Sequence, residues 1–82
     1  MGRMNQTSKT AVLNELRLLV KSATRRRLDN DIPGAIVIEQ SIADIIDTAK
    51  EHGFDGEVQY YKKDGERDAE EEKYRWDNWV MV

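Results

Sequence analysis

The sequence predicts a small α+β domain in which two helices precede an antiparallel β-hairpin, the order ααββ. Two observations predict this order. Up to residue 53, apolar residues recur every three or four positions, which is typical of helices packed on one side. Beyond residue 56, alternating residues flank an Asp-Gly pair, which is typical of two strands joined by a turn. A chain of 82 residues has room for one domain, residues 1–82.

The first predicted helix follows a short N-terminal segment, residues 1–6, which we expect to be flexible. Thr7 or Ser8 can cap this helix, because a side-chain oxygen can accept a hydrogen bond from an amide of the first turn. Three arginines fall in its last turn, where positive charge offsets the helix dipole. Its apolar face consists of Val12, Leu13, Leu16, Leu19, Val20 and Ala23.

The second predicted helix lies between residues 31 and 53. Asp31 or Pro33 can begin it, since proline is tolerated in the first turn, and Gly53 can end it in the left-handed conformation. The β-branched residues at 35–39 leave another interpretation open, in which this segment is a short extra strand. Continuous helical spacing favours a single helix, whose apolar face consists of Ala35, Ile38, Ile42, Ile45, Ile46 and Ala49.

The hairpin is predicted from residue 57 onward, with the acidic residues 64–72 as a mobile loop between its strands. Side chains alternate between the two faces of a strand, so residues three apart face opposite sides. Trp76 and Trp79 therefore cannot both face the helices, and the sequence does not decide which of them is exposed. The outer face is expected to carry Tyr61, Lys63, Lys73, Arg75, Trp79 and Met81.

Charge is distributed unevenly along the chain. Residues 1–28 contain seven bases and one acid, a net charge of +6. Residues 29–82 contain six bases and fifteen acids, a net charge of −9, which leaves −3 for the whole chain. This asymmetry indicates either an electrostatic partner or an attraction between the two segments, within one fold or across a dimer.

Several classes of function are excluded or disfavoured. The chain has no cysteine, which excludes disulfides, thiolate catalysis and cysteine-ligated metals. Its single histidine and its scattered glycines form neither a catalytic triad nor a phosphate-binding loop, so we expect no catalysis and no cofactor. Lacking an apolar run of the ~18 residues that span a membrane and an N-terminal signal core, it is expected to be cytoplasmic and away from membranes.

The leading hypothesis is a non-enzymatic, acidic binding protein that regulates or inhibits a protein partner. Exposed aromatic and methionine side chains are typical of interfaces, and ordered carboxylates can occupy sites for phosphates, as in inhibitors from phages and mobile elements. The unpaired strand edges would also allow a homodimer. The expected partner-binding residues are Tyr61, Trp79, Met81, Asp64, Glu66, Asp68, Glu70, Glu71 and Glu72.

Two alternatives stay open. One is a divalent-metal-dependent enzyme, because Asp44, Asp47 and Glu51 are spaced to share one helix face, although a solvated face is the ordinary explanation. The other is a nucleic-acid-binding regulator, since arginine and lysine bind phosphates. Its expected contact residues are Arg25, Arg26, Arg27, Lys63, Lys73 and Arg75.

Overall fold

The computed structural model describes residues 6–80, and the side chains of residues 8–75 within them. This part of the chain forms three helices, α1 (Gln6–Leu28), α2 (Ile32–His52) and α3 (Asp55–Val80), joined by short turns. No strand occurs between residues 6 and 80. The predicted α+β class, with a hairpin after two helices, is therefore wrong, and the described chain is all-helical.

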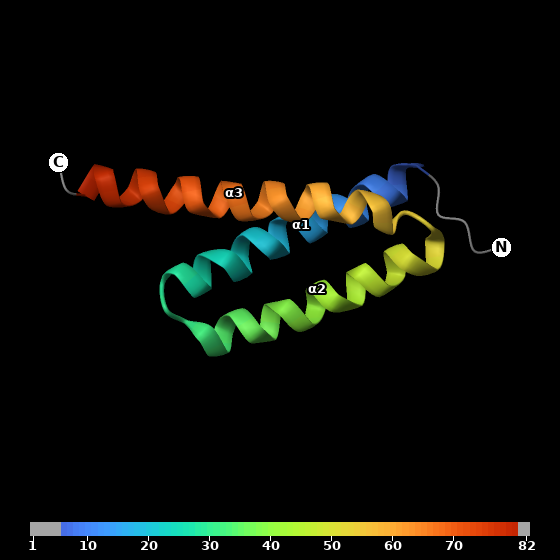
Figure 1. Cartoon of the computed structure of the whole chain (residues 1–82), viewed down its shortest axis with the longest axis horizontal. Helices are drawn as coiled ribbons and strands as arrows, with labels where there is room; N and C mark the ends of the chain where they lie inside the picture. Colours follow the sequence, from blue (N-terminus) through green and yellow to red (C-terminus); the bar gives the residue numbers. More distant parts are fainter. Residues whose placement is uncertain (1–5, 81–82) are drawn as a thin grey trace.

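The central helix is α1, which packs against both α2 and α3, while α2 and α3 contact each other little. Helix α2 runs back along α1, and α3 then runs in the same direction as α1 (Figure 1). The C-terminal end of α3 projects past the turn that joins α1 to α2. None of these helices, within the residues described, is both long and apolar enough to cross a membrane.

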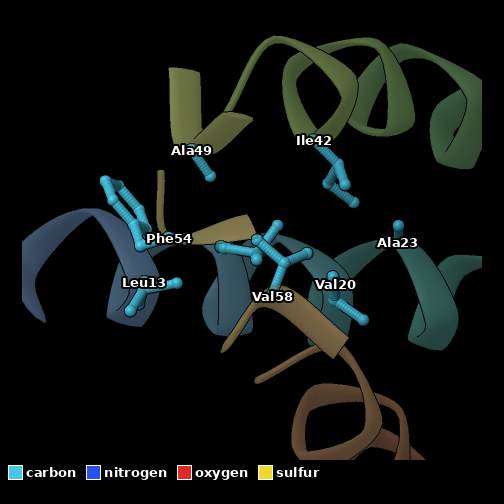
Figure 2. Packing of buried hydrophobic residues seen from close by; sticks show 8 residues of the cluster. Leu13, Val20, Ala23, Ile42, Ala49, Phe54 and Val58 are labelled. Carbon is cyan, nitrogen blue, oxygen red and sulfur yellow. The ribbon is translucent and has the colours of Figure 1, made fainter. Parts of the chain in front are cut away.

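The hydrophobic core is one cluster to which all three helices contribute, and its side chains point toward one another in Figure 2. Phe54, in the turn between α2 and α3, and Val58, in α3, pack onto the apolar faces predicted for the first two helices. Those two faces are confirmed. The buried members are Leu13, Leu16, Val20, Ala23, Ile42, Ala49, Phe54 and Val58.

Helix α2 has the boundaries that the sequence predicts. The Asp31 carboxylate accepts a hydrogen bond from the Gly34 amide at 3.2 Å, and proline occupies the first turn. At the other end Gly53 adopts a left-handed φ of 80°, and its amide donates to the Lys50 carbonyl at 3.2 Å. Residues 35–39 lie inside this helix, so the strand interpretation is wrong. The helical spacing that buries Ala35 outweighs the β-branched composition.

Helix α1 begins at Gln6, so Thr7 and Ser8 lie within the helix and do not cap it. The remainder of the N-terminal segment expected to be flexible lies outside the described residues. As predicted, the helix ends at Leu28 with three arginines in its last turn. The turn that follows contains Asn30 with a φ of 65°, a conformation that asparagine tolerates better than most residues.

Helix α3 replaces the predicted hairpin, including its connecting loop at residues 64–72. The physical reason lies in composition, because no Val, Ile or Thr occurs between Val58 and Val80. Residues 62–73 are instead rich in Lys, Glu, Arg and Ala, which favour helix. The pair Asp64-Gly65, which the sequence presents as a turn, lies mid-helix, and Gly65 is buried where α3 approaches α1.

Candidate functional site

The described bases of residues 1–28 form ion pairs with acids of residues 29–82 within the fold. Of the seven bases in residues 1–28, six lie in the described part of the chain, and each contacts an acid from residues 29–82. The attraction between the two segments therefore operates within one protomer. The pairs are Lys9–Glu57, Arg17–Asp68, Lys21–Glu72, Arg25–Asp29, Arg26–Asp31 and Arg27–Glu39.

Three of these pairs join α1 to α3, and we call them the charge ladder: Lys9–Glu57, Arg17–Asp68 and Lys21–Glu72. The Arg17 Nη1 donates to Asp68 Oδ2 at 2.8 Å, and both side chains are about one-third exposed. Asp68 and Glu72, which were expected to bind a partner, are therefore directed to α1. Ladder pairs of this exposure are weak singly, and all three connect α3 to α1.

The arginines at the end of α1 are also engaged by carboxylates. Arg27 donates two hydrogen bonds to Glu39, from Nε to Oε2 at 2.5 Å and from Nη2 to Oε1 at 2.6 Å. These bonds hold the pKa of Glu39 below its ordinary value and raise the pKa of Arg27. Arg26 Nη1 donates to Asp31 at 2.8 Å.

Asp29 forms ion pairs with two of the cations expected to bind nucleic acid, Lys73 and Arg25. Lys73 Nζ donates to Asp29 Oδ1 at 3.1 Å, and Arg25 Nε donates to Oδ2 at 3.4 Å. The hydrogen bond from Lys73 is the main cause of a lowered pKa of Asp29, with a further contribution from Arg25. Arg75 is exposed, and so is Lys63, which lies about three turns before Lys73 on α3. The six expected contact residues therefore do not form one uncompensated basic surface.

The side of α3 that faces away from α1 carries a line of exposed residues. Tyr60 and Tyr74 are 72% and 71% exposed, and each lies seven residues from Arg67. Seven residues make nearly two helical turns, so these three side chains share one side of α3. We call this side the outer face of α3, and it comprises Tyr60, Lys63, Asp64, Arg67, Glu70, Glu71 and Tyr74, all of which are exposed.

The acidic residues expected to bind a partner divide between two sides of α3. Asp64, Glu70 and Glu71 lie on the outer face, and Glu66 lies at its edge beside Lys62. None of these four forms an ion pair with another described residue, whereas Asp68 and Glu72 pair with α1. The sequence identifies these acids as candidates, but only the position of α1 separates the paired acids from the solvated ones.

The expected aromatic site is only partly described. Tyr61 is half-buried and packs against the core, so the outward tyrosine of this pair is Tyr60. The side chain of Trp79 and the whole of Met81 lie outside the described residues. The strand alternation that sets Trp76 against Trp79 does not hold in a helix, in which residues three apart share a face. The sequence shows the seven-residue spacing of Tyr60, Arg67 and Tyr74, but this spacing indicates a shared side only once the segment is known to be a helix.

The residues expected in the metal alternative do not converge. Asp44, Asp47 and Glu51 are all exposed along α2. The described part of the chain contains no group of three or more acidic, histidine or cysteine side chains that could hold a metal ion. His52 stacks on Phe54 with ring centroids 6.4 Å apart, and its buried Nδ1 has no hydrogen-bond partner among the described residues.

An open groove of about 310 Å³ lies between α2 and α3, over α1. Its lining is apolar where Val20, Ala23, Ile42 and Ile46 meet, and charged where Glu39, Lys62 and Glu66 border it. The groove exists because α2 and α3 both pack on α1 and contact each other little. It contains no buried polar side chain that would select a small ligand.

Comparison with protein-family models, with curated proteins and with solved structures found no match for this chain. Its class is therefore defined by the fold and its surface. Within residues 8–75, the protein is a charged three-helix chain without a group of acidic, histidine or cysteine side chains that could hold a metal ion, and its most exposed aromatic residues there, Tyr60 and Tyr74, lie on one side of α3.

Proposed function

We propose that this protein is a non-enzymatic binding protein that regulates or inhibits a protein partner through the outer face of α3. The observation that carries this proposal is the line of Tyr60, Arg67 and Tyr74 on the solvated side of the helix. Tyrosine and arginine are the residues that most often anchor protein interfaces. A tyrosine also provides a large contact area with little loss of side-chain freedom.

The charge of the outer face indicates the chemistry of the partner. Asp64, Glu70 and Glu71 outnumber Lys63 and Arg67 on this face, and these acids have no ion pair within the described residues. We infer that the partner presents a basic surface, because complementary charge steers association and disfavours wrong partners. Carboxylates held at fixed spacing by a helix can also occupy sites for phosphates, which would make the protein an inhibitor of nucleic-acid binding.

The nucleic-acid alternative receives less support from the same geometry. Binding to phosphates would require Arg25, Arg26 and Arg27 to exchange the carboxylates that they already contact. The six cations expected for this function also do not gather on one surface. A protein partner for the outer face of α3 needs no such exchange.

The test is affinity capture with three immobilised forms of the chain. These are the wild type, the double variant Tyr60→Ala/Tyr74→Ala and the control Leu18→Ala, which removes an exposed apolar side chain from α1. We expect a protein partner on the wild type and the control, and at least about tenfold weaker retention on the double variant, as for loss of interface anchors.

Two further measurements, after nuclease treatment and at raised salt, decide between a protein partner and a nucleic-acid partner. Nuclease treatment should leave retention unchanged, and salt should weaken it, because the proposed contact is partly electrostatic. Equal retention by the double variant would refute the outer face as the binding surface. Loss of all retention after nuclease would instead favour the nucleic-acid alternative.

A further inference from the structure

An open hollow of about 570 Å³ lies beside the last turns of α1, and we call it the end hollow. Its walls come from α1, from the turn after α1 and from α3, so residues far apart in the sequence meet there. Its charged lining residues are Lys21, Arg25, Arg26, Asp29, Asp31 and Glu72. The bases therefore share one solvent-open concavity with an equal number of acids.

The chain's own carboxylates hold the bases of the end hollow. Lys21 Nζ lies 2.5 Å from Glu72 Oε2, and Arg26 Nη1 lies 2.8 Å from Asp31 Oδ2. These are the distances of charge-assisted hydrogen bonds between a cation and an anion oxygen. An anion oxygen therefore already lies at each of these bases in the place that the oxygen of a bound phosphate would take.

Arg25 is the base that can be released most easily. Its Nε lies 3.4 Å from Asp29 Oδ2, the longest of the six ion pairs described for α1. Lys73 donates to the other oxygen of Asp29 at 3.1 Å. Asp29 therefore keeps a partner when the guanidinium of Arg25 turns to another anion.

Glu72 can also leave its base without losing contact with water. Its side chain is 53% exposed, and pairs of this exposure are weak. A chain of phosphates presents several anions to the bases at once, whereas each carboxylate presents one. Such a chain can therefore displace Glu72 and Asp29 together.

We propose that the end hollow binds the phosphate groups of a phosphate chain, either a single strand of nucleic acid or inorganic polyphosphate, and that Asp29 and Glu72 mask it in the free protein. The planar guanidinium of Arg25 can donate two hydrogen bonds to one phosphate, and Lys21 supplies a point charge. The exposed Ser22 hydroxyl also lines the hollow and can donate to a phosphate oxygen. The exchange that weighs against nucleic acid as the main partner is, at this site, the step that regulates binding.

The end hollow and the outer face of α3 are separate surfaces. Glu72 is directed to α1, whereas Tyr60 and Tyr74 lie on the solvated side of α3. The inference therefore does not depend on the proposed protein partner, and its test leaves both tyrosines unchanged. Masking lowers the apparent affinity by the fraction of molecules in which the hollow is open. The wild type should bind phosphate chains weakly, and removal of the masking acids should strengthen binding.

The test is the binding of a fluorescein-labelled oligothymidylate of about 15 nucleotides at about 50 mM salt, measured by fluorescence anisotropy. The unmasked variant is Asp29→Asn/Glu72→Gln. Its matched control is Asp44→Asn/Glu51→Gln, which makes the same two replacements at exposed positions of α2 and also changes the net charge from −3 to −1. We expect the unmasked variant to bind at least about tenfold more tightly than the control, and both to lose affinity as salt rises.

Two further variants locate the effect in the end hollow. Adding Arg25→Gln to the unmasked variant should return its affinity to that of the control. Glu72→Gln alone leaves the turn after α1 unchanged and should bind about threefold more tightly than Glu51→Gln. This pair decides the matter if the double variant loses helical content. Equal affinity of the unmasked variant and its control at equal helical content, or tight binding that survives Arg25→Gln, would overturn the proposal.

Competition distinguishes the two sources of phosphate. Inorganic polyphosphate is added to the complex of the unmasked variant with the oligothymidylate. Displacement at a matched concentration of phosphate groups would show that the site recognises phosphate alone, as the proposed contacts of Lys21 and Arg25 require. Retention of the oligothymidylate, with affinity that still depends on Arg25, would assign the site to nucleic acid.

Discussion

Gly65 of α3 lies directly against the backbone of Arg17 in α1. A Cβ atom placed on Gly65 would stand 2.6 Å from the Arg17 carbonyl oxygen and 3.0 Å from the Cβ of Val20. Ala69, one turn farther along α3, is completely buried. These small residues let the two helices approach closely, and the approach brings the acids of the charge ladder within reach of the bases on α1.

Replacement of Gly65 by alanine should therefore destabilise the fold. An added methyl group must displace backbone, which typically costs about 1–3 kcal/mol in a well-packed interior. Gly56 is the matched control, because it lies in the same helix with open space around its Cβ position. Gly56→Ala should raise the free energy of unfolding by about 0.4–1 kcal/mol. Urea unfolding measures both changes, and equal effects at the two glycines would contradict the close approach.

The charge ladder should stabilise α3 on α1 in a salt-dependent way. A double-mutant cycle with Arg17→Met and Asp68→Asn isolates the pair whose atoms lie 2.8 Å apart. We expect a coupling free energy of about 0.2–1 kcal/mol at low salt, as for partly exposed pairs. The coupling should shrink toward zero near 1 M salt, where the screening length falls to about 3 Å. A coupling that salt leaves unchanged would mean that the two side chains interact through packing.

The pair of Arg27 and Glu39 should contribute to stability above the ordinary carboxyl pKa. Because Arg27 lowers the folded-state pKa of Glu39, the folded state favours the ionised form more than the unfolded state does. This stabilisation is complete above the unfolded pKa and is lost as the pH falls through the lower, folded value. The difference in unfolding free energy between the wild type and Glu39→Gln should therefore decline as the pH falls below the ordinary Glu pKa.

Denaturant unfolding at a series of pH values checks this expectation. Asp29→Asn offers a second case, because the hydrogen bond from Lys73 lowers the pKa of Asp29 in the same direction. A difference between wild type and Glu39→Gln that grows on acidification would reverse the predicted sign, and the Arg27–Glu39 pair would then not persist in solution.

The turn between α2 and α3 should be sensitive at Gly53. Its φ of 80° lies in the left-handed region, which a residue with a Cβ atom adopts at a cost of about 1–2 kcal/mol. Gly53→Ala should lower the free energy of unfolding by about 1 kcal/mol, even though nothing blocks its Cβ position. Thermal unfolding is a sufficient measurement. Stabilisation by Gly53→Ala, as expected at Gly56, would refute the left-handed cap.

Truncation of a core aromatic residue should lower stability far more than truncation of a surface aromatic residue. Phe54 is only 6% exposed, so Phe54→Ala should cost about 3–5 kcal/mol. Tyr60 is 72% exposed, so Tyr60→Ala should change stability by less than about 0.5 kcal/mol. Urea unfolding of the two variants compares them directly. A large loss at Tyr60 would mean that it is part of the packing and is not available to a partner.

The first two helices could be predicted from the sequence because their buried faces are made of Leu, Ile, Val and Ala at helical spacing. Helix α3 lacks that signal. Between Gly65 and Glu72 its inner side consists of small residues and ladder acids such as Asp68, which leave no apolar period. Close backbone contact and ion pairing therefore hold this helix against α1, and hydrophobic patterning does not reveal them. The pair Asp64-Gly65 also has the composition of a turn, although it lies mid-helix.

The candidate site could be predicted only in part, because the sequence does not show where α1 lies. The acidic run between Asp64 and Glu72 was identified as a surface of interest, but its division into paired and solvated acids depends on where α1 lies. The choice between Tyr60 and Tyr61 was reversed, because a strand and a helix direct neighbouring side chains differently. The arginines at the end of the first helix, Arg25, Arg26 and Arg27, were candidates for nucleic-acid contact, and only the structure shows the acids that pair with them.

The central claim is that the acidic C-terminal segment is one continuous helix, bound to α1 on one side and solvated on the other. The most direct measurement is the set of ¹³Cα secondary chemical shifts for residues 57–75, together with nuclear Overhauser effects between Gly65 and the Val20 methyl groups. We predict helical shifts at every one of these residues and a clear Gly65–Val20 contact. Strand-like shifts at 57–63, or a Gly65 with no contact to Val20, would contradict the account.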